Sequence, residues 1–286
     1  MKEKVGVIDV GSNSVRLLLT SGDKGEKTVI VTALADNMEK GKKLNEQSVS
    51  RTVEAVRLLF LQAKNKRANK VYIFATEAVR KAENRAEFCE KVYLETGETV
   101  DVVDGKTEAK LGLLGALNGL DGGIIDVGGA STEIAISNDK KFTYQKSVDI
   151  GSVKINNLCG QDAKQIEDLA KEYSPKFKPP QCDNYYAIGG TATTLAGIAQ
   201  NLVPYDPNKV DGYYLSAEKI KDLANELFLL SVEERVRKYN LIERRAKVIA
   251  GGALWLYQVL KELNIHGVTV SEKDNLEGYL LYKGEI

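Results

Sequence analysis

The chain has 286 residues, of which 43% are hydrophobic and 28% charged, the composition of a soluble globular protein with one large domain or two ordinary ones. Forty basic and forty acidic residues give zero formal net charge, so any polyanion must be held by a local patch and not by a global field. Three scattered cysteines, one histidine and no long apolar run argue against a multi-histidine metal centre and a membrane span, and we expect a cytoplasmic protein.

The first half of the chain predicts strands and helices in alternation. The helix at 50–67 carries apolar residues at helical spacing, and Asn84 with Glu87 predicts a capping box that opens the helix ending near Thr96. A glycine-rich stretch at 118–123 predicts a hinge, which divides the chain into domains 1–117 and 118–286. The other elements expected in this half are strands at 4–9, 15–20, 28–34, 70–75 and 99–103 and a helix at 107–117.

The second half restarts the same pattern, and strand–helix alternation in both halves predicts an α/β fold. We expect the last helix, within 275–286, to pack back on the first domain. The predicted strands lie at 123–126, 132–136, 142–148, 185–188 and 267–270, and the predicted helices at 191–199, 216–230, 231–239, 243–263 and 275–283.

One phrase occurs twice: residues 7–14 (VIDVGSNS) return 117 positions later as residues 124–131 (IIDVGGAS). Each copy reads as a strand, a tight glycine turn and a second strand. Glycine lets the backbone approach a ligand, and successive N–H groups in such a turn form an anion-binding nest. One alternative is a pair of glycine hairpins without a ligand, but the repetition favours two phosphate loops facing one polyanion. The predicted phosphate contacts are Gly11, Ser12, Asn13, Ser14, Gly128, Gly129 and Ser131.

The two copies differ in charge. Asp9 and Asp126 each end the first strand, where a carboxylate makes sense if Mg²⁺ (or Mn²⁺) lies between it and a phosphate. Arg16 in the first copy aligns with Glu133 in the second. We therefore expect Arg16 to bind phosphate and Asp9 and Asp126 to serve a metal ion, with Glu133 as a second carboxylate beside Asp126.

Five motifs in order resemble the exopolyphosphatase / guanosine pentaphosphate phosphatase (Ppx/GppA) family, in its short two-domain form within the actin-like superfamily. The resemblance covers essentially the whole chain and implies two actin-like (ribonuclease H-like) domains with a central cleft. The motifs are residues 8–17, 75–84, 105–111, 125–133 and 188–196.

The resemblance also implies roles. Glu108 falls where the family has the glutamate that activates the attacking water, and Arg80 falls on its phosphate-binding arginine. Asp126 and Glu133 fall on the magnesium side. Gly189, Gly190 and Thr191 mark a nucleotide region or a second phosphate region.

The leading hypothesis is a Mg²⁺-dependent hydrolase that releases terminal phosphate from inorganic polyphosphate or guanosine pentaphosphate, without nucleic acid or membrane partners. A homodimer is one option for its oligomeric state. The alternatives are an ATP-using phosphotransferase of the same superfamily and a non-catalytic alarmone-binding regulator. The sequence leaves the choice of substrate and the oligomeric state open. Departures from the family pattern at Ala130, Lys154, Lys247 and 274–276 concern substrate choice more than the hydrolytic centre.

Overall fold

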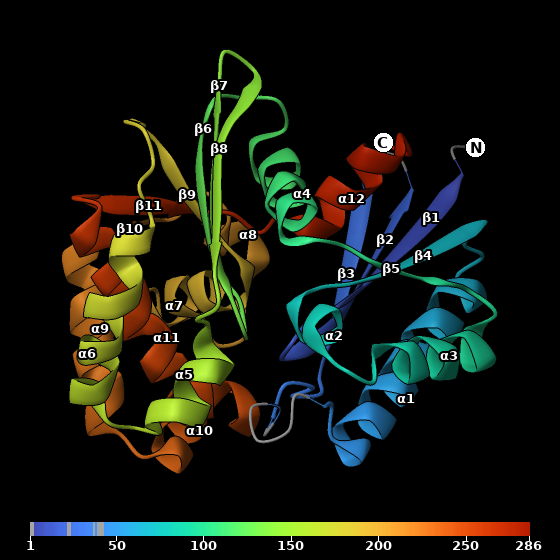
Figure 1. Cartoon of the computed structure of the whole chain (residues 1–286), viewed down its shortest axis with the longest axis horizontal. Coiled ribbons are helices and arrows are strands. Elements are labelled where there is room, and N and C mark those ends of the chain that lie inside the picture. The colour runs from blue at the N-terminus through green and yellow to red at the C-terminus, as the bar shows by residue number, and fades with distance from the viewer. Residues whose placement is uncertain (1–2, 22–23, 37, 39–42) are drawn as a thin grey trace. The chain divides into compact units, whose positions relative to one another are not determined.

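The computed structural model describes residues 3–21, 24–36, 38 and 43–286, and it forms two compact units (Figure 1). Unit 1 comprises Met1–Gly115 and Asn275–Ile286, and unit 2 comprises Ala116–Asp274. The division falls inside helix α4 (Gly105–Leu117), two residues before the boundary predicted from the glycine-rich stretch.

Unit 1 is built on a five-stranded sheet in which β1, β2 and β3 form an antiparallel meander and β4 and β5 run parallel to β1. Strand β1 is buried on both faces, since Val7 and Ile8 point to opposite sides and neither is exposed, which explains its continuous apolar sequence. The sheet order is β3 (Lys24–Val31), β2 (Ser14–Ser21), β1 (Lys4–Val10), β4 (Lys70–Ala75) and β5 (Val100–Val102).

Helices cover both faces of this sheet. Helix α1 covers one face, where a Cβ added to Gly6 would lie 3.4 Å from Ala63. On the other face Tyr279 of α12 stacks on Phe74 with ring centroids 4.6 Å apart, and Figure 1 shows α12, in red, beside the blue strands. The helices of this unit are α1 (Glu46–Asn65), α2 (Glu77–Lys81), α3 (Arg85–Thr96), α4 and α12 (Asn275–Lys283).

Unit 2 contains a six-stranded sheet whose buried face is packed by helices around α11 (Glu243–Glu262). Trp255 of α11 is fully buried, and its indole N–H donates to Thr132 Oγ1 at 2.8 Å. The sheet order is β10 (Tyr214–Ser216), β11 (Gly267–Val270), β9 (Tyr185–Ile188), β6 (Gly122–Val127), β7 (Thr132–Asn138) and β8 (Lys141–Val148). The other helices are α5 (Ser152–Cys159), α6 (Ala163–Tyr173), α7 (Gly189–Ala199), α8 (Pro207–Val210), α9 (Ala217–Leu229) and α10 (Val232–Tyr239), with a 3₁₀ turn at Ser174–Lys176.

The two sheets share one topology over four strands. The order β3-β2-β1-β4 in unit 1 matches β8-β7-β6-β9 in unit 2, and in both the fourth strand is parallel to the first. The repeated phrase in the sequence therefore marks a repeated piece of structure, and the predicted α/β class is confirmed. In the described part of the chain, no helix combines the length and the apolarity needed to cross a bilayer.

One local prediction was wrong, and several elements were not predicted, namely α2, α5, α6, α8 and β10. Asn84 does not cap α3, because its Oδ1 accepts from Leu44 N at 2.9 Å and its Nδ2 donates to Leu44 O at 3.1 Å. Helices α5 and α6 were missed, although Asp162 and Gln165 carried a start signal: Asp162 Oδ1 accepts from Gln165 N at 3.0 Å, and Oδ2 accepts from Gln165 Nε2 at 2.9 Å.

We predict that Gly278→Ala destabilises the protein by roughly 1–3 kcal/mol or more, the usual cost of overpacking. A Cβ at Gly278 in α12 would overlap the carbonyl oxygen of Leu111 in α4 and lie 2.6 Å from its carbonyl carbon. Helix propensity alone would favour alanine by about 1 kcal/mol, so the loss would come from the clash. Urea unfolding measures the loss in the free energy of unfolding, and Tyr282→Ala, an exposed change on the same helix, is the control. An unchanged or higher stability of Gly278→Ala would contradict the close contact.

Candidate functional site

The two glycine loops have the same backbone geometry. In unit 1 the N–H of Gly11 donates to Ser14 O at 3.0 Å, and in unit 2 the N–H of Gly128 donates to Ser131 O at 3.0 Å. A Cβ on either glycine would lie 3.2 Å from that same oxygen. Both turns are thus equally tight, as the repeated sequence predicted.

In unit 1 the carbonyl oxygens of the glycine loop accept hydrogen bonds from the segment that follows β3. Ser12 O accepts from Ala35 N at 2.9 Å, and Asn13 O accepts from Thr32 N at 3.0 Å and Ala33 N at 2.9 Å. Because C=O and N–H point in opposite directions across a trans peptide, the N–H of Asn13 is turned away from this segment. It donates to none of the described residues, so it remains open to an anion.

In unit 2 the start of α5 donates the corresponding hydrogen bonds to the carbonyl oxygens of the second loop. Gly128 O accepts from Ser152 N at 2.8 Å, and Gly129 O accepts from Val153 N at 2.8 Å and Lys154 N at 3.0 Å. These bonds satisfy the first N–H groups of α5, which has no side-chain cap. The missed helix α5 therefore supports the second glycine loop.

Gly151 and Ala130 show how closely this support fits. A Cβ on Gly151 would lie 2.7 Å from both Gly128 O and Gly129 O, so only glycine fits there. Ala130 has no positive φ, so an alanine at this position imposes no backbone strain. Its N–H, which follows Gly129 O, donates to no described residue.

The charged pairs beside the loops differ as the alignment of the copies predicted. Asp9 and Arg16 face each other across β1 and β2, and Asp9 Oδ2 accepts from Arg16 Nε at 3.0 Å and also from Arg16 Nη2. In unit 2 the same register places Asp126 opposite Glu133. The first loop therefore carries an ion pair, in which Arg16 already serves Asp9, and the second carries two carboxylates.

The carboxylate pair of unit 2 suits a hard cation. Glu133 is buried, with Oε1 accepting from Ser147 Oγ at 2.6 Å, and a Cβ on Gly189 (φ +78°) would lie 2.5 Å from Asp126 Oδ1. Glycine at 189 thus keeps the space beside Asp126 clear. Mg²⁺ is commonly held by one or two carboxylates, with water and substrate phosphate completing its shell. Among the described residues no group of three or more His, Cys, Asp or Glu side chains gathers, so such an ion would need those outer ligands.

Arg80 and Glu108, predicted from separate motifs, are in direct contact in unit 1. Arg80 Nη1 donates to Glu108 Oε2 and to Val103 O, both at 2.8 Å, and Nη2 donates to Glu77. Burial works against the charge of Arg80, but Glu108 and Glu77 outweigh it and raise the pKa of Arg80 above its ordinary value. Arg80 is therefore a fixed, fully charged group.

The start of α4 sets the position of Glu108. Asp104 Oδ1 accepts from Thr107 N at 2.6 Å, and this backbone hydrogen bond lowers the pKa of Asp104. The N–H of Glu108 donates to Asp104 O at 2.9 Å, so Glu108 lies in the first helical turn. Its side chain is only 9% exposed, so Glu108 is not a solvated surface glutamate.

Two charged residues near the predicted sites were missed. Glu77 bonds Arg80, although the motif pointed only to the arginine. Arg245, in the first turn of α11, lies against the backbone of Gly190, where an added Cβ would be 2.8 Å from its Cζ. It brings a cation to the predicted region at Gly189, Gly190 and Thr191, and only the tertiary fold could reveal this.

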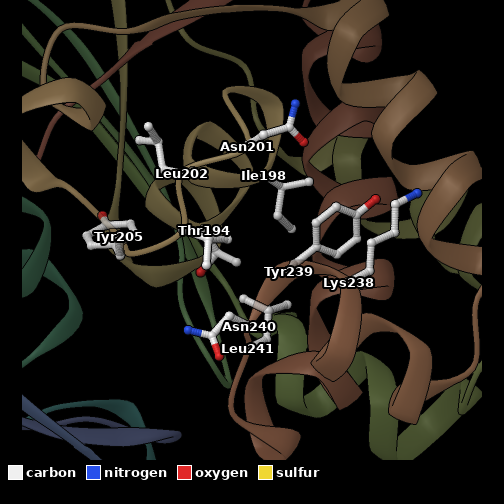
Figure 2. Close-up of a pocket in the computed structure, with 11 residues that line it drawn as sticks. Thr194, Ile198, Asn201, Leu202, Tyr205, Lys238, Tyr239, Asn240 and Leu241 are labelled. Atoms are coloured by element: carbon white, nitrogen blue, oxygen red, sulfur yellow. The ribbon is translucent and has the colours of Figure 1, made fainter.

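That region is joined to the second loop, because Thr191 Oγ1 donates to Val127 O at 2.9 Å. A small pocket of about 120 Å³ lies between the second half of α7 and the end of α10 (Figure 2). Its lining runs from Thr194 in α7 to Asn201, just beyond the end of that helix. Ile198, Leu202 and Tyr239 are among its lining residues, and Gly189–Thr191 are not.

The chain is similar to known proteins along nearly its whole length. The family description "Ppx/GppA phosphatase family" matches residues 25–283. The chain is 25% identical to Exopolyphosphatase 2 of Mycobacterium tuberculosis, over 97% of this chain and 98% of that protein. It is 27% identical to a bifunctional 3-dehydroquinate synthase/phosphatase of Fusobacterium nucleatum over 96% of this chain, but it spans only 46% of that protein.

A solved structure of the type II variant of the Aquifex aeolicus Ppx/GppA phosphatase superposes with a TM-score of 0.74 at 30% identity, over 98% of this chain and 99% of the other. This likeness confirms the predicted fold. With a family match over nearly the whole length and the repeated loops in place, the chain belongs to the Ppx/GppA phosphatase family.

Proposed function

We propose that this protein is a Mg²⁺-dependent hydrolase that releases terminal phosphate from a linear phosphoanhydride, with inorganic polyphosphate preferred over guanosine pentaphosphate. The observation that supports the proposal is the partly buried contact between Glu108 and Arg80, in which a carboxylate lies beside a guanidinium. The relatives named as an exopolyphosphatase and a phosphatase support the reaction class.

Arg80 is suited to grip a phosphate. A guanidinium has five N–H groups, and the contacts to Glu108, Val103 and Glu77 use two on Nη1 and one on Nη2. Within the described residues the Nε–H and the second Nη2–H have no acceptor. Two such N–H groups are what bidentate phosphate binding requires.

Glu108 would act as the general base. It would take a proton from a water molecule as the water oxygen attacks the terminal phosphorus, while the bridging P–O bond breaks and the shortened chain leaves with the bond electrons. The N–H groups of Asn13 and Ala130 would each hold phosphate oxygens.

Asp126 and Glu133 are the residues proposed to hold Mg²⁺ or Mn²⁺. The bound ion would neutralise charge that develops on the phosphoryl oxygens. Asp9 remains a predicted metal ligand, but its contact with Arg16 makes the pair in unit 2 the stronger candidate.

The preference for polyphosphate rests on the small size of the pocket along α7; two larger pockets, of about 710 and 560 Å³, are lined by none of Gly189, Gly190 and Thr191. A guanosine substrate needs a shaped site, and ligand pockets usually measure about 300–1,000 Å³. The pocket beside α7 measures about 120 Å³, and Gly189, Gly190 and Thr191 do not line it. A linear polyanion needs only repeated N–H and cationic contacts, which the loops, Arg80 and Arg245 could supply.

We also propose a cytoplasmic location, since Cys89, Cys159 and Cys182 are all unpaired, as expected in a reducing compartment. The homodimer stays a prediction, which light scattering of the purified protein checks.

We predict that Glu108→Gln folds normally and binds tripolyphosphate but loses roughly 10²-fold or more in kcat, the scale of general-base catalysis. The amide keeps the size of the side chain and an oxygen for Arg80 but cannot accept the proton of water. Phosphate release and calorimetric binding measure the two effects. A variant with nearly wild-type turnover would remove Glu108 from this role.

We predict a ladder of intermediate lengths when polyphosphate is partly digested, because zero net charge favours frequent release of the chain. Gel analysis shows the products. Full-length chains that pass directly to the smallest products would exclude distributive cleavage. Rapid cleavage of guanosine pentaphosphate alone would reverse the substrate preference.

We also predict that removal of Mg²⁺ with EDTA abolishes phosphate release and that addition of Mg²⁺ restores it.

We predict that Gly151→Ala raises KM for polyphosphate roughly 10-fold or more, because displacement of a site by about 1 Å can cost as much as about 10²-fold in rate. The added methyl group would push on Gly128 O and Gly129 O and displace the second loop. Leu158→Ala, an exposed change on the same helix, is the matched control. Equal KM values for both variants would show that this loop does not bind substrate.

A further inference from the structure

Glu77 is a buried carboxylate beside the proposed centre to which the hydrolytic mechanism gives no task. It opens α2 directly after β4, and the residue is 4% exposed. Charged side chains are rarely so buried unless they are paired. Glu77 has two partners: Oε2 accepts from Arg80 Nη2, and Oε1 lies 2.6 Å from Lys81 Nζ.

Arg80 is therefore held from two sides. Glu108 and Val103 O accept from Nη1, and Glu77 accepts from Nη2. Contacts at both ends of a planar group fix its rotation as well as its position. Without Glu77 the guanidinium would be held at Nη1 only and could turn about that end toward Glu108.

Lys81 completes the arrangement. Its contact with the second oxygen of Glu77 balances part of the carboxylate charge, and Lys81 itself is 44% exposed. Glu77 can thus orient Arg80 without cancelling the charge that a phosphate would meet.

We propose that Glu77 is a positioning residue that holds Arg80 with its two remaining N–H groups directed at the terminal phosphate of the substrate. The inference rests on the proposed function, because it assigns to Arg80 the role of phosphate binder. Glu77 touches neither the phosphate nor the water and acts only through Arg80.

A double-mutant cycle tests this role. We compare the wild type, Glu77→Ala, Arg80→Ala and the double variant by kcat and KM on a short polyphosphate. Glu77→Ala should lower kcat/KM by about 10–100-fold, mainly through KM, the scale of lost hydrogen bonds to a charged group. In the Arg80→Ala background the same change should matter less than about 2-fold, because there is no guanidinium left to orient.

Two further variants separate positioning from folding. Glu77→Gln keeps an oxygen that can accept from Arg80 and should recover part of the loss in kcat/KM. It replaces Glu77→Ala in the double-mutant cycle if Glu77→Ala fails to fold. Glu87→Ala removes an exposed carboxylate that contacts Lys91 at 2.8 Å with the same i, i+4 spacing as Glu77 and Lys81, and it should leave KM unchanged. Independent, multiplicative losses in the double variant would overturn the proposal, as would unchanged KM in Glu77→Ala.

Calorimetry also measures the affinity of the same four proteins for inorganic tripolyphosphate. If the wild type hydrolyses neither polyphosphate nor guanosine pentaphosphate, the proposed function fails, and non-additive affinities would still support the role of Glu77. If the wild type does not bind tripolyphosphate at all, the positioning role is overturned as well.

Discussion

The direction of the loop carbonyls is the constraint on which the candidate site depends. A peptide whose C=O accepts a hydrogen bond on one side presents its N–H on the other side, so the hydrogen bonds accepted by Ser12 O and Gly129 O decide where the open N–H groups of both loops point. Different elements solve the same problem: an irregular segment after β3 in unit 1, and the first turn of α5 in unit 2. This explains why Gly151 has no room for a side chain although it lies outside every predicted motif.

The buried charges serve position more than stability. Removing Arg80, Glu108 and Glu77 from water costs free energy that their mutual attraction at best repays, so an apolar cluster of the same volume could be as stable. What the ion network provides is a guanidinium with a defined orientation. The contrast with Asp9 and Arg16 is instructive, because there the arginine bonds its cross-strand partner through Nε and Nη2, the same pair of groups that a phosphate would need.

Local patterns predicted most elements, and long-range contacts decided what they missed. The apolar runs of β1 and β6 and the long α11 were evident because hydrophobic periodicity is a local property. Helix α1 begins at Glu46 and not at residue 50, since Asn45 caps it through Gln47 N and Ser48 N. Asn84 had the right spacing for a cap but was drawn to the backbone of Leu44, forty residues away. Glu108 and Arg80 came from motifs, whereas Glu77 and Arg245 became visible only through their neighbours in space.

The return of α12 to unit 1 has a consequence for how the chain folds during synthesis. Unit 2 is one continuous stretch and can bury its core as soon as residue 274 has left the ribosome. Unit 1 starts earlier but lacks the helix that covers Val5, Val7 and Phe74 until residues 275–286 have been made. The N-terminal sheet therefore keeps one apolar face incompletely covered while the later unit folds, and exposed apolar surface of this kind makes a nascent chain prone to aggregation.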